Sequence, residues 1–395
     1  MNVTQAAYQV ERDLASPLAV WPEYSPATIP LVIFDDDDFR FYNHPAPPQR
    51  RPAHMMGATA AEIDGVWTAL VPVTTCQDET DLIPLVYHEC FHAFQHSGAF
   101  RFDEQFDFFR SLAFYPELDA TYRALCLAEI EVLESPGLQP GQKATLLAGL
   151  AERRQAILAA RADLPAFVQH LERLEGTAFY VEQQVRAQRF GVPAEMFSAH
   201  YGGVVPGKYG WTRHHAVGAA ICRLLDGTYD NWQGQVAGGA SLSALLIDRF
   251  GQQRVDLACL DLAAIVAREQ QSASQIRAGL EAQIAQLEQD GAIRIQWPEG
   301  ASVVQMLSPT AAVSLGDGRL LHGSFLTIQL PNGTIQLQGG RILQDYNRRE
   351  VMFPAVPVDH TADRLQVDTD TAQIALSGVG RIGENRFRLA QKTRG

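Results

Sequence analysis

The stretch LIPLVYHECFHAF at residues 82–94 is apolar over most of a helical circumference and contains the pattern His-Glu-x-x-His. Residues four apart lie on one face of a helix, so His88 and His92 can offer two imidazole nitrogens to one metal ion. Glu89 lies next to them, where its carboxylate can accept a proton. The stretch therefore predicts a metal-binding helix with His88 and His92 as ligands and Glu89 as a general base.

The apolar residues around the motif predict that this helix is buried on most sides. An unpaired buried polar or charged group costs several kcal/mol, and a metal ion would supply the missing partner. Zinc is the expected ion, because two histidines and one carboxylate leave a tetrahedral zinc one open position, where bound water reaches a pKa of about 7. The alternative is a chance match on a surface helix, and the apolar neighbours argue against it.

Composition limits the classes of function. The chain has 395 residues, 46% of them hydrophobic and 19% charged, which is enough to bury a large core in two or three domains. The formal net charge of −13, without a basic cluster, argues against nucleic-acid and anionic-membrane partners. Five widely spaced cysteines without a Cys-x-x-Cys pair favour a reducing compartment. Because the chain has neither a basic start followed by an apolar core nor an apolar run of about 18 residues, we expect a cytoplasmic protein.

Hydrophobic periodicity divides the chain into a small N-terminal sheet, a helical region and a β-rich end. Apolar runs predict strands at 29–34 and 66–73, within a sheet region of about residues 1–75. Helical periodicity fills about residues 80–290, in segments at 116–134, 140–162, 165–190, 213–226, 241–249 and 255–289. Short alternating runs predict a small all-β domain at 296–395. The predicted fold class is α+β, with a mainly helical domain at 1–295 followed by this β domain.

One hairpin of the β-rich end can be assigned a register from the sequence. A two-residue turn at Asn332-Gly333 would join two alternating strands. It would place Leu330 opposite Ile335, and Ile328 opposite Leu337, on one face. Further strands are expected near 365–367, 373–376 and 386–389.

A zinc site on the motif helix needs a third protein ligand from elsewhere. His96 is too far along the helix, because eight residues separate it from His88 by about 12 Å. We expect either a structural role for His96 or a role in supporting a ligand. Glu175 is the better candidate, because Gly176 and Ala178 are small and would let its helix approach the motif helix closely. The competing carboxylates are Glu172, Glu182, Glu129 and Glu131. The alternative for Glu175 itself is that it is a surface charge paired with a nearby arginine.

The segment EGTAFY at 175–180, taken with the His-Glu-x-x-His pattern, resembles the gluzincin group of zinc metallopeptidases. In that group a later helix supplies the ligand glutamate, often within Glu-Gly-x-Ala-x-Tyr. The resemblance covers roughly residues 60–226 and implies a zincin-like metallopeptidase domain with His88, His92 and Glu175 as zinc ligands. The 83 residues between His92 and Glu175 exceed the spacing of thermolysin-like members, and Phe179 replaces the usual Asp. The chain would therefore belong to a divergent branch.

A further site residue is implied by the same resemblance. Gluzincins commonly place a Tyr or His across the site to stabilise the oxyanion, and Tyr-x-x-Gly is a frequent local form. His215 begins the corresponding spacing, which ends at Gly218. The resemblance thus implies His215 as the catalytic oxyanion donor, with Tyr209 and His214 as alternatives. The alternative interpretation is that this segment is only the start of a helix rich in aromatic residues and has no catalytic role.

Together these expectations describe a zinc-dependent metallohydrolase, a peptidase that cleaves amide bonds by attack of zinc-bound water with Glu89 as general base. Its partner would be a peptide or protein substrate, extended along the strand at 66–73 as along an edge strand. One alternative is a catalytically inactive zincin-fold binding protein with a structural metal site. Another is a hydrolase of non-peptide amides or esters. No feature of the sequence specifies an oligomeric state.

Overall fold

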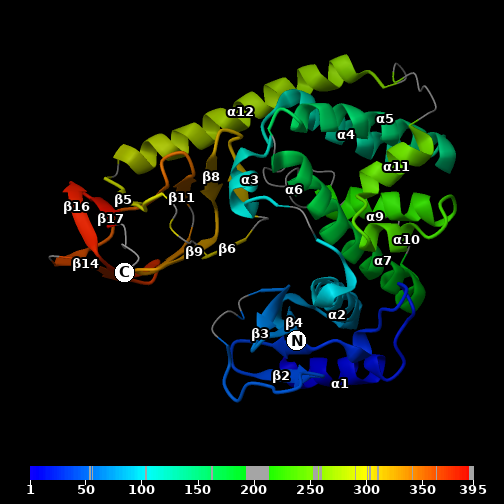
Figure 1. Cartoon of the computed structure of the whole chain (residues 1–395), viewed down its shortest axis with the longest axis horizontal. Helices are drawn as coiled ribbons and strands as arrows, with labels where there is room; N and C mark the ends of the chain where they lie inside the picture. The colour runs from blue at the N-terminus through cyan, green and yellow to red at the C-terminus, as the bar shows by residue number, and fades with distance from the viewer. Residues whose placement is uncertain are drawn as a thin grey trace.

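The computed structural model describes residues 1–52, 55, 57–102, 105–161, 163–192, 213–251, 257, 260–289, 291–299, 301, 304–308, 311–339, 341–361 and 363–390. Within these residues the fold class is α+β, as the sequence predicts (Figure 1). A small sheet lies near the N-terminus, helices fill the middle, and strands form the C-terminal part. None of the helices in this described part has the length and apolar character that a bilayer span requires.

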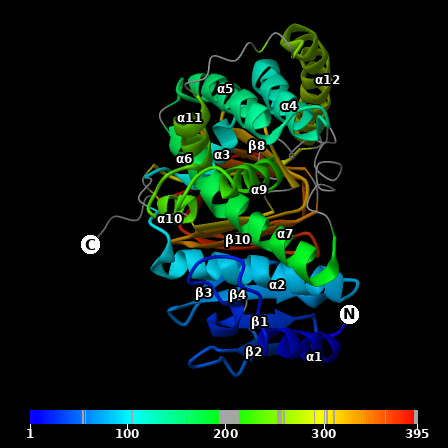
Figure 2. The same cartoon turned by 90° about the vertical axis from the view of Figure 1, so that its right-hand side faces the viewer.

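The N-terminal sheet supports the motif helix and has the strand order β2-β1-β4-β3. Its strands are β1 (Leu31–Phe34), β2 (Phe39–Tyr42), β3 (Thr59–Ile63) and β4 (Val66–Pro72), and short 3-10 turns occupy Pro26–Thr28 and Val73–Thr75. Helices α1 (Val3–Leu14) and α2 (Glu79–Phe94) pack in the core on one face of the sheet, and α2 lies directly above it in Figure 2. Apolar residues of β1 and β4 that point to this face are fully buried.

Strand β4 is an interior strand, so the prediction that residues 66–73 pair with substrate as an edge strand is wrong. β1 pairs with β4 in parallel on one side, and β3 pairs antiparallel on the other. Both hydrogen-bonding sides of the β4 backbone are therefore occupied. Among the described residues, the free edge on this side of the sheet belongs to β3.

The helical middle contains the predicted segments together with helices that the periodicity does not reveal. Its helices are α3 (Phe108–Phe114), α4 (Ala120–Glu134), α5 (Pro140–Leu158), α6 (Asp163–Leu171), α7 (Thr177–Phe190), α9 (Arg213–Asp226), α10 (Trp232–Ala237), α11 (Leu242–Phe250) and α12 (Leu262–Gln289). The single helix predicted at 165–190 is α6 and α7, joined by a wide π turn at Glu172–Gly176. A second π turn, at Gln95–Ala99, follows α2 directly.

The C-terminal part is built of two packed sheets. The strands are β5 (Ile293–Gln296), β6 (Val304–Leu307), β7 (Ala312–Ser314), β8 (Arg319–His322), β9 (Phe325–Leu330), β10 (Gly333–Gln338), β11 (Ile342–Asp345), β12 (Glu350–Phe353), β13 (Asp359–Thr361), β14 (Arg364–Asp368), β15 (Ala372–Ser377), β16 (Val379–Gly383) and β17 (Arg386–Leu389). Their orders are β13-β14-β15-β10-β9-β6 and β16-β17-β5-β12-β11-β8-β7. Apolar side chains of both sheets enter one core.

The hairpin of β9 and β10 forms, but its predicted register is wrong by two residues. Leu330 pairs with Gly333, and Ile328 pairs with Ile335. The turn residues are therefore Pro331 and Asn332, neither of which has the positive φ that an Asn-Gly turn of type I′ requires. Proline cannot donate a ladder hydrogen bond and its fixed φ suits a turn, which excludes Pro331 from the strand. A shift of two residues keeps the same side chains on the buried face.

Candidate metal centre

The motif helix α2 is capped at its start and buried where the motif lies. The Asp78 side chain accepts a hydrogen bond from the Thr80 backbone N–H, which satisfies one of the free donors of the first turn. His88, Glu89 and His92 are 6%, 4% and 7% exposed. Polar groups buried to this degree need partners, as the sequence analysis anticipates.

Three possible ligand atoms lie close to a common point. Nε2 of His88 and Nε2 of His92 are 3.0 Å apart, and Oε2 of Glu175 lies 3.4 Å from the His92 nitrogen and 3.9 Å from the His88 nitrogen. A triangle with these sides has a point about 2.0 Å from every corner, which is the usual distance from zinc to nitrogen and oxygen ligands. The predicted ligand set is thus brought together with spacing that suits one metal ion.

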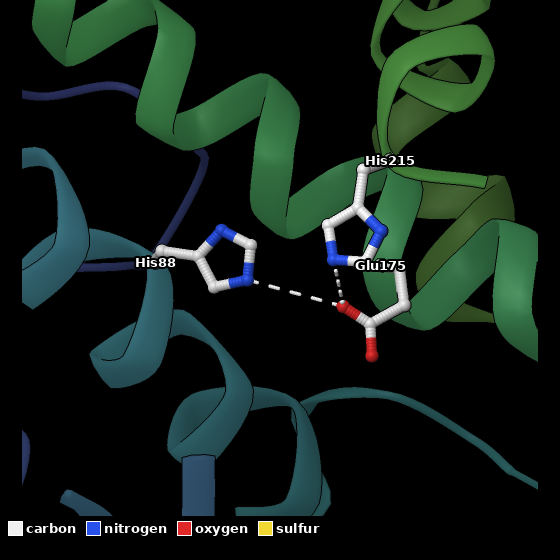
Figure 3. Close-up of side chains that lie close together, drawn as sticks. All are labelled: His88, Glu175 and His215. Carbon is white, nitrogen blue, oxygen red and sulfur yellow. Dashed lines mark ion pairs between the residues drawn. The ribbon is translucent and has the colours of Figure 1, made fainter. Parts of the chain in front are cut away.

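His215 lies on the side of the Glu175 carboxylate that is opposite the motif helix (Figure 3). Its Nε2 atom is 2.9 Å from Oε2 of Glu175, the same oxygen that faces the two motif histidines. Figure 3 shows the rings of His88 and His215 converging on this oxygen from separate helices, and the two rings are nearly parallel. The group His88, Glu175 and His215 could hold a metal ion.

Two glycines explain how Glu175 and His215 meet. A Cβ atom on Gly176 would lie 2.8 Å from the Cα atom of Gly218, so neither position has room for a larger residue. Helix α9 therefore crosses the π turn backbone to backbone, and His215, one helical turn before Gly218, lies against Glu175. The predicted close packing of this helix against the motif helix is present between α7 and α2, and Gly176 itself allows a second close approach, to α9.

The outer nitrogen of His88 contacts a charged pair. Oε2 of Glu182 is 3.0 Å from Nδ1 of His88, and Arg186 pairs with the same carboxylate at 3.1 Å. Arg186 also donates to the backbone carbonyl of Thr80 at 3.0 Å. That carbonyl lacks its usual helical donor, because the residue four positions on is Pro84, which has no N–H. The proline in the motif helix thus supplies an acceptor that orients the arginine.

Charges around the ligand atoms keep Glu175 ionised. Burial opposes the charged form, but His215 and His92 outweigh it and hold the pKa of the Glu175 carboxyl well below its usual range. Burial also opposes the charged form of His92, yet the Glu175 carboxylate raises the His92 pKa to about 9. A protonated His92 imidazole would therefore supply the positive charge beside Glu175 when no metal ion is bound. A divalent ion would replace that proton with a stronger positive charge.

Glu89 differs from the other carboxylates near the site. Burial raises the pKa of Glu89, although His88 and His92 oppose this shift. Its Oε2 atom is buried and has no hydrogen-bond partner among the described residues. A buried carboxyl group that is neither paired nor capped is available for proton transfer.

The remaining candidates lie elsewhere. Glu172 accepts hydrogen bonds from Ser243, Glu129 pairs with Arg154 and Arg213, and Glu131 reaches the exposed Arg268. The His96 ring stacks on Trp67, and burial lowers its pKa to about 4. His214 is fully buried beside Tyr115. Tyr209 lies outside the described residues.

Sequence reasoning missed the supporting roles of Gln95 and Arg186, and it named Glu182 only as a competing ligand. Gln95, Glu182 and Arg186 contact the motif histidines or each other, yet none belongs to the motif. A signal for Glu182 was present, since it lies seven residues after Glu175, two turns along the same helical face. No comparable signal exists for Gln95.

Comparison of the chain with protein-family models, with curated proteins and with solved structures gave no match.

Proposed function

We propose that the protein is a zinc-dependent metallohydrolase that cleaves peptide bonds, in a divergent branch of the gluzincin-like enzymes. The observation that supports this proposal best is the triangle of His88 Nε2, His92 Nε2 and Glu175 Oε2 next to the unpaired carboxyl group of Glu89. Two histidines and one carboxylate are a donor set that zinc favours in hydrolytic sites. Zinc bound there would supply Lewis acidity, which acidifies water and polarises a carbonyl group.

Glu89 is the general base of the proposed reaction. Its carboxylate takes a proton from the attacking water and passes it to the leaving amine, so one residue serves both halves of the cleavage. The raised pKa of Glu89 suits this exchange, because a base with a pKa nearer neutrality also releases its proton as an acid. A site that held metal only for structure would not need this group.

His215 is the proposed donor to the oxyanion that forms when the peptide carbonyl is attacked. Its Nε2 atom already faces the ligand cluster from the side opposite the motif helix. A hydrogen-bond donor in such a position contributes a few kcal/mol to the transition state.

An extended substrate would pair with β3 rather than with β4. Within the part of the chain that the structure describes, β3 has one unpaired edge that offers backbone donors and acceptors to a peptide, and β3 lies against the motif helix. Binding as an added strand selects a peptide over a compact ester or a small amide. Turnover of ester substrates without turnover of peptides would favour the non-peptide alternative.

The test of the proposed function is the substitution Glu89→Gln in the full chain. Glutamine keeps the shape of the side chain but cannot accept the proton, so peptide hydrolysis should fall by about 10²–10⁴-fold while zinc content is unchanged. Glu79→Gln is the matched control, since Glu79 lies on the same helix but is only partly buried and pairs with Arg12. Hydrolysis of a peptide library at the wild-type rate by Glu89→Gln would exclude the mechanism.

A second candidate function, a structural metal site, is favoured by one observation. His215 lies close enough to Glu175 to act as a fourth ligand, and four protein ligands would close the site. X-ray absorption of the zinc-loaded protein separates the two candidates. Three protein ligands and one water indicate an open site, whereas four protein ligands and unfolding on chelation indicate a structural one.

A further inference from the structure

The side chain of Gln95 joins the motif helix to the segment that carries Glu175. Gln95 follows His92 by three residues and is completely buried. Its Oε1 atom lies 2.9 Å from Nδ1 of His92. Its Nε2 atom donates to the backbone carbonyls of Arg173 and Leu174, both at 3.1 Å, and to the Thr177 hydroxyl at 2.8 Å.

The two carbonyl groups belong to the π turn at Glu172–Gly176, where each has one other donor: Arg173 accepts from the Thr177 hydroxyl, and Leu174 accepts from the Thr177 backbone N–H. In a regular α-helix each carbonyl accepts from the N–H four residues on, and a π turn disturbs that ladder. A carbonyl oxygen has two lone pairs, so the Gln95 amide adds a second hydrogen bond to each of these buried groups. The Gln95 amide supplies donors at the turn that presents Glu175 to the cluster.

The same contacts decide which of the two nitrogens carries the proton in the neutral His92 ring. Carbonyl oxygens only accept, so the amide end of Gln95 that faces the π turn must be the NH₂ group. The end that faces His92 is therefore the oxygen, and Nδ1 of His92 must carry the proton. Nε2 of the neutral ring is then left with its lone pair pointing toward His88 and Glu175, as a metal ligand requires.

We propose that Gln95 is a positioning residue that fixes both the His92 ring and the π turn bearing Glu175, so that two ligands from separate helices are held by one amide. The consequence for metal binding rests on the proposed function. The positioning itself is a property of the metal-free chain. A glutamine suits both tasks, because one acceptor and two donors are needed at a single buried position.

Two variants of the full chain separate the two tasks. Gln95→Met keeps the length and removes both the acceptor and the donors. Gln95→Glu keeps an oxygen for His92 and removes the donors to the π turn. Gln344→Met is the matched control, since Gln344 is also fully buried and its amide bonds His322 at 3.2 Å and Gln305 at 2.9 Å, inside the C-terminal sheets.

Hydrogen exchange of the metal-free proteins tests the positioning without zinc. Amides of residues 172–178 should exchange at least about 10-fold faster in both Gln95 variants, and at the wild-type rate in Gln344→Met. Should Gln95→Met fail to fold, exchange in Gln95→Glu decides alone. Unchanged exchange in this segment would overturn the proposal, whatever the zinc content.

Zinc affinity, measured by competition with a chelator, tests the consequence for the ligands. Gln95→Met should bind zinc about 10–100-fold more weakly than wild type, as expected when the partner of a ligand histidine is lost. Gln95→Glu should lose less, because it still accepts from His92. Wild-type affinity in Gln95→Met would overturn the positioning of His92. A wild-type protein that binds no zinc would contradict the proposed function, and exchange would still report on the π turn.

Discussion

The outer nitrogens of the two motif histidines have partners of different charge. Gln95 is neutral, whereas Glu182 is a carboxylate 3.0 Å from Nδ1 of His88. Burial opposes ionisation of Glu182, but His88 and Arg186 lower its pKa below the usual value, so it stays charged. A carboxylate behind a ligand histidine makes the imidazole a stronger donor to metal.

Glu182→Gln removes this charge and keeps the side-chain shape. We expect zinc affinity to fall by about 10–100-fold, because the His88 ring becomes a weaker ligand. Chelator competition measures the change. Glu172→Gln is the control, since Glu172 is also buried but accepts a hydrogen bond from Ser243, away from the ligand atoms. A larger loss of zinc in Glu172→Gln than in Glu182→Gln would show that the wrong carboxylate supports the site.

A site residue can be predicted from the sequence when its partners are close to it in the chain, and not when they are distant. His88, Glu89 and His92 share one helix, so their spacing alone places them together. Glu175 was found through the small residue beside it, although that residue contacts Gly218 rather than the motif helix. Gln95 could not be found, because its carbonyl partners lie 78 and 79 residues away, at a turn whose π geometry has no sequence signature.

Helix α9 can cross close to the π turn because Gly176 and Gly218, which meet at the crossing, have no side chains. Gly176→Ala would push a Cβ into the backbone of Gly218, which cannot yield as a flexible side chain would. We expect a loss of about 1–3 kcal/mol in the free energy of unfolding, and weaker zinc binding because His215 and Glu175 move apart. Urea unfolding of the metal-free chain and chelator competition measure the two effects.

Gly279→Ala is the matched control for Gly176→Ala, and we expect it to raise the free energy of unfolding rather than lower it. Gly279 lies within helix α12, and a Cβ there would meet nothing within 4 Å. The substitution should stabilise the chain by about 0.4–1 kcal/mol, since alanine reduces the entropy of the unfolded state. If Gly176→Ala were as favourable as Gly279→Ala, close approach of the two backbones would not be what positions α9.

Strand pairing shows where local pattern is insufficient at the level of elements. Alternation identified β9 and β10, but the register depended on whether Pro331 lies in the strand or in the turn. The interior position of β4 depended on β3, which is partly exposed and has no strong apolar pattern. Both errors concern which strand or residue pairs with which, and the sequence of a single strand does not specify its pairing partner.

The C-terminal sheets and the helices that present the site share cores. Phe167 and Leu171 of α6, which leads into the π turn, belong to the same apolar cluster as Ile295 and other strand residues. Helix α12 packs Leu280 and Ile284 against the outer face of the seven-stranded sheet, and it spans both halves in Figure 1. The predicted boundary at residue 296 lies at the end of β5, an interior strand of the seven-stranded sheet, so the β part begins one strand earlier than predicted and its packing is continuous with the helices.

Ile295→Ala tests this shared packing. The residue is fully buried, and its truncation should cost about 2–5 kcal/mol. Because the cores are continuous, hydrogen exchange in increasing urea should show the same decrease in midpoint for α6 and for β10. A decrease confined to the strands, with α6 unchanged, would show that the two halves unfold independently.

The most direct test of the metal centre is anomalous diffraction at the zinc edge from crystals of the zinc-loaded full-length protein. We expect one strong peak about 2.0–2.2 Å from Nε2 of His88, Nε2 of His92 and a carboxylate oxygen of Glu175. Crystals of Glu175→Ala should show a much weaker peak. A peak held by other residues, or a fully loaded protein without zinc between these three side chains, would contradict the assignment.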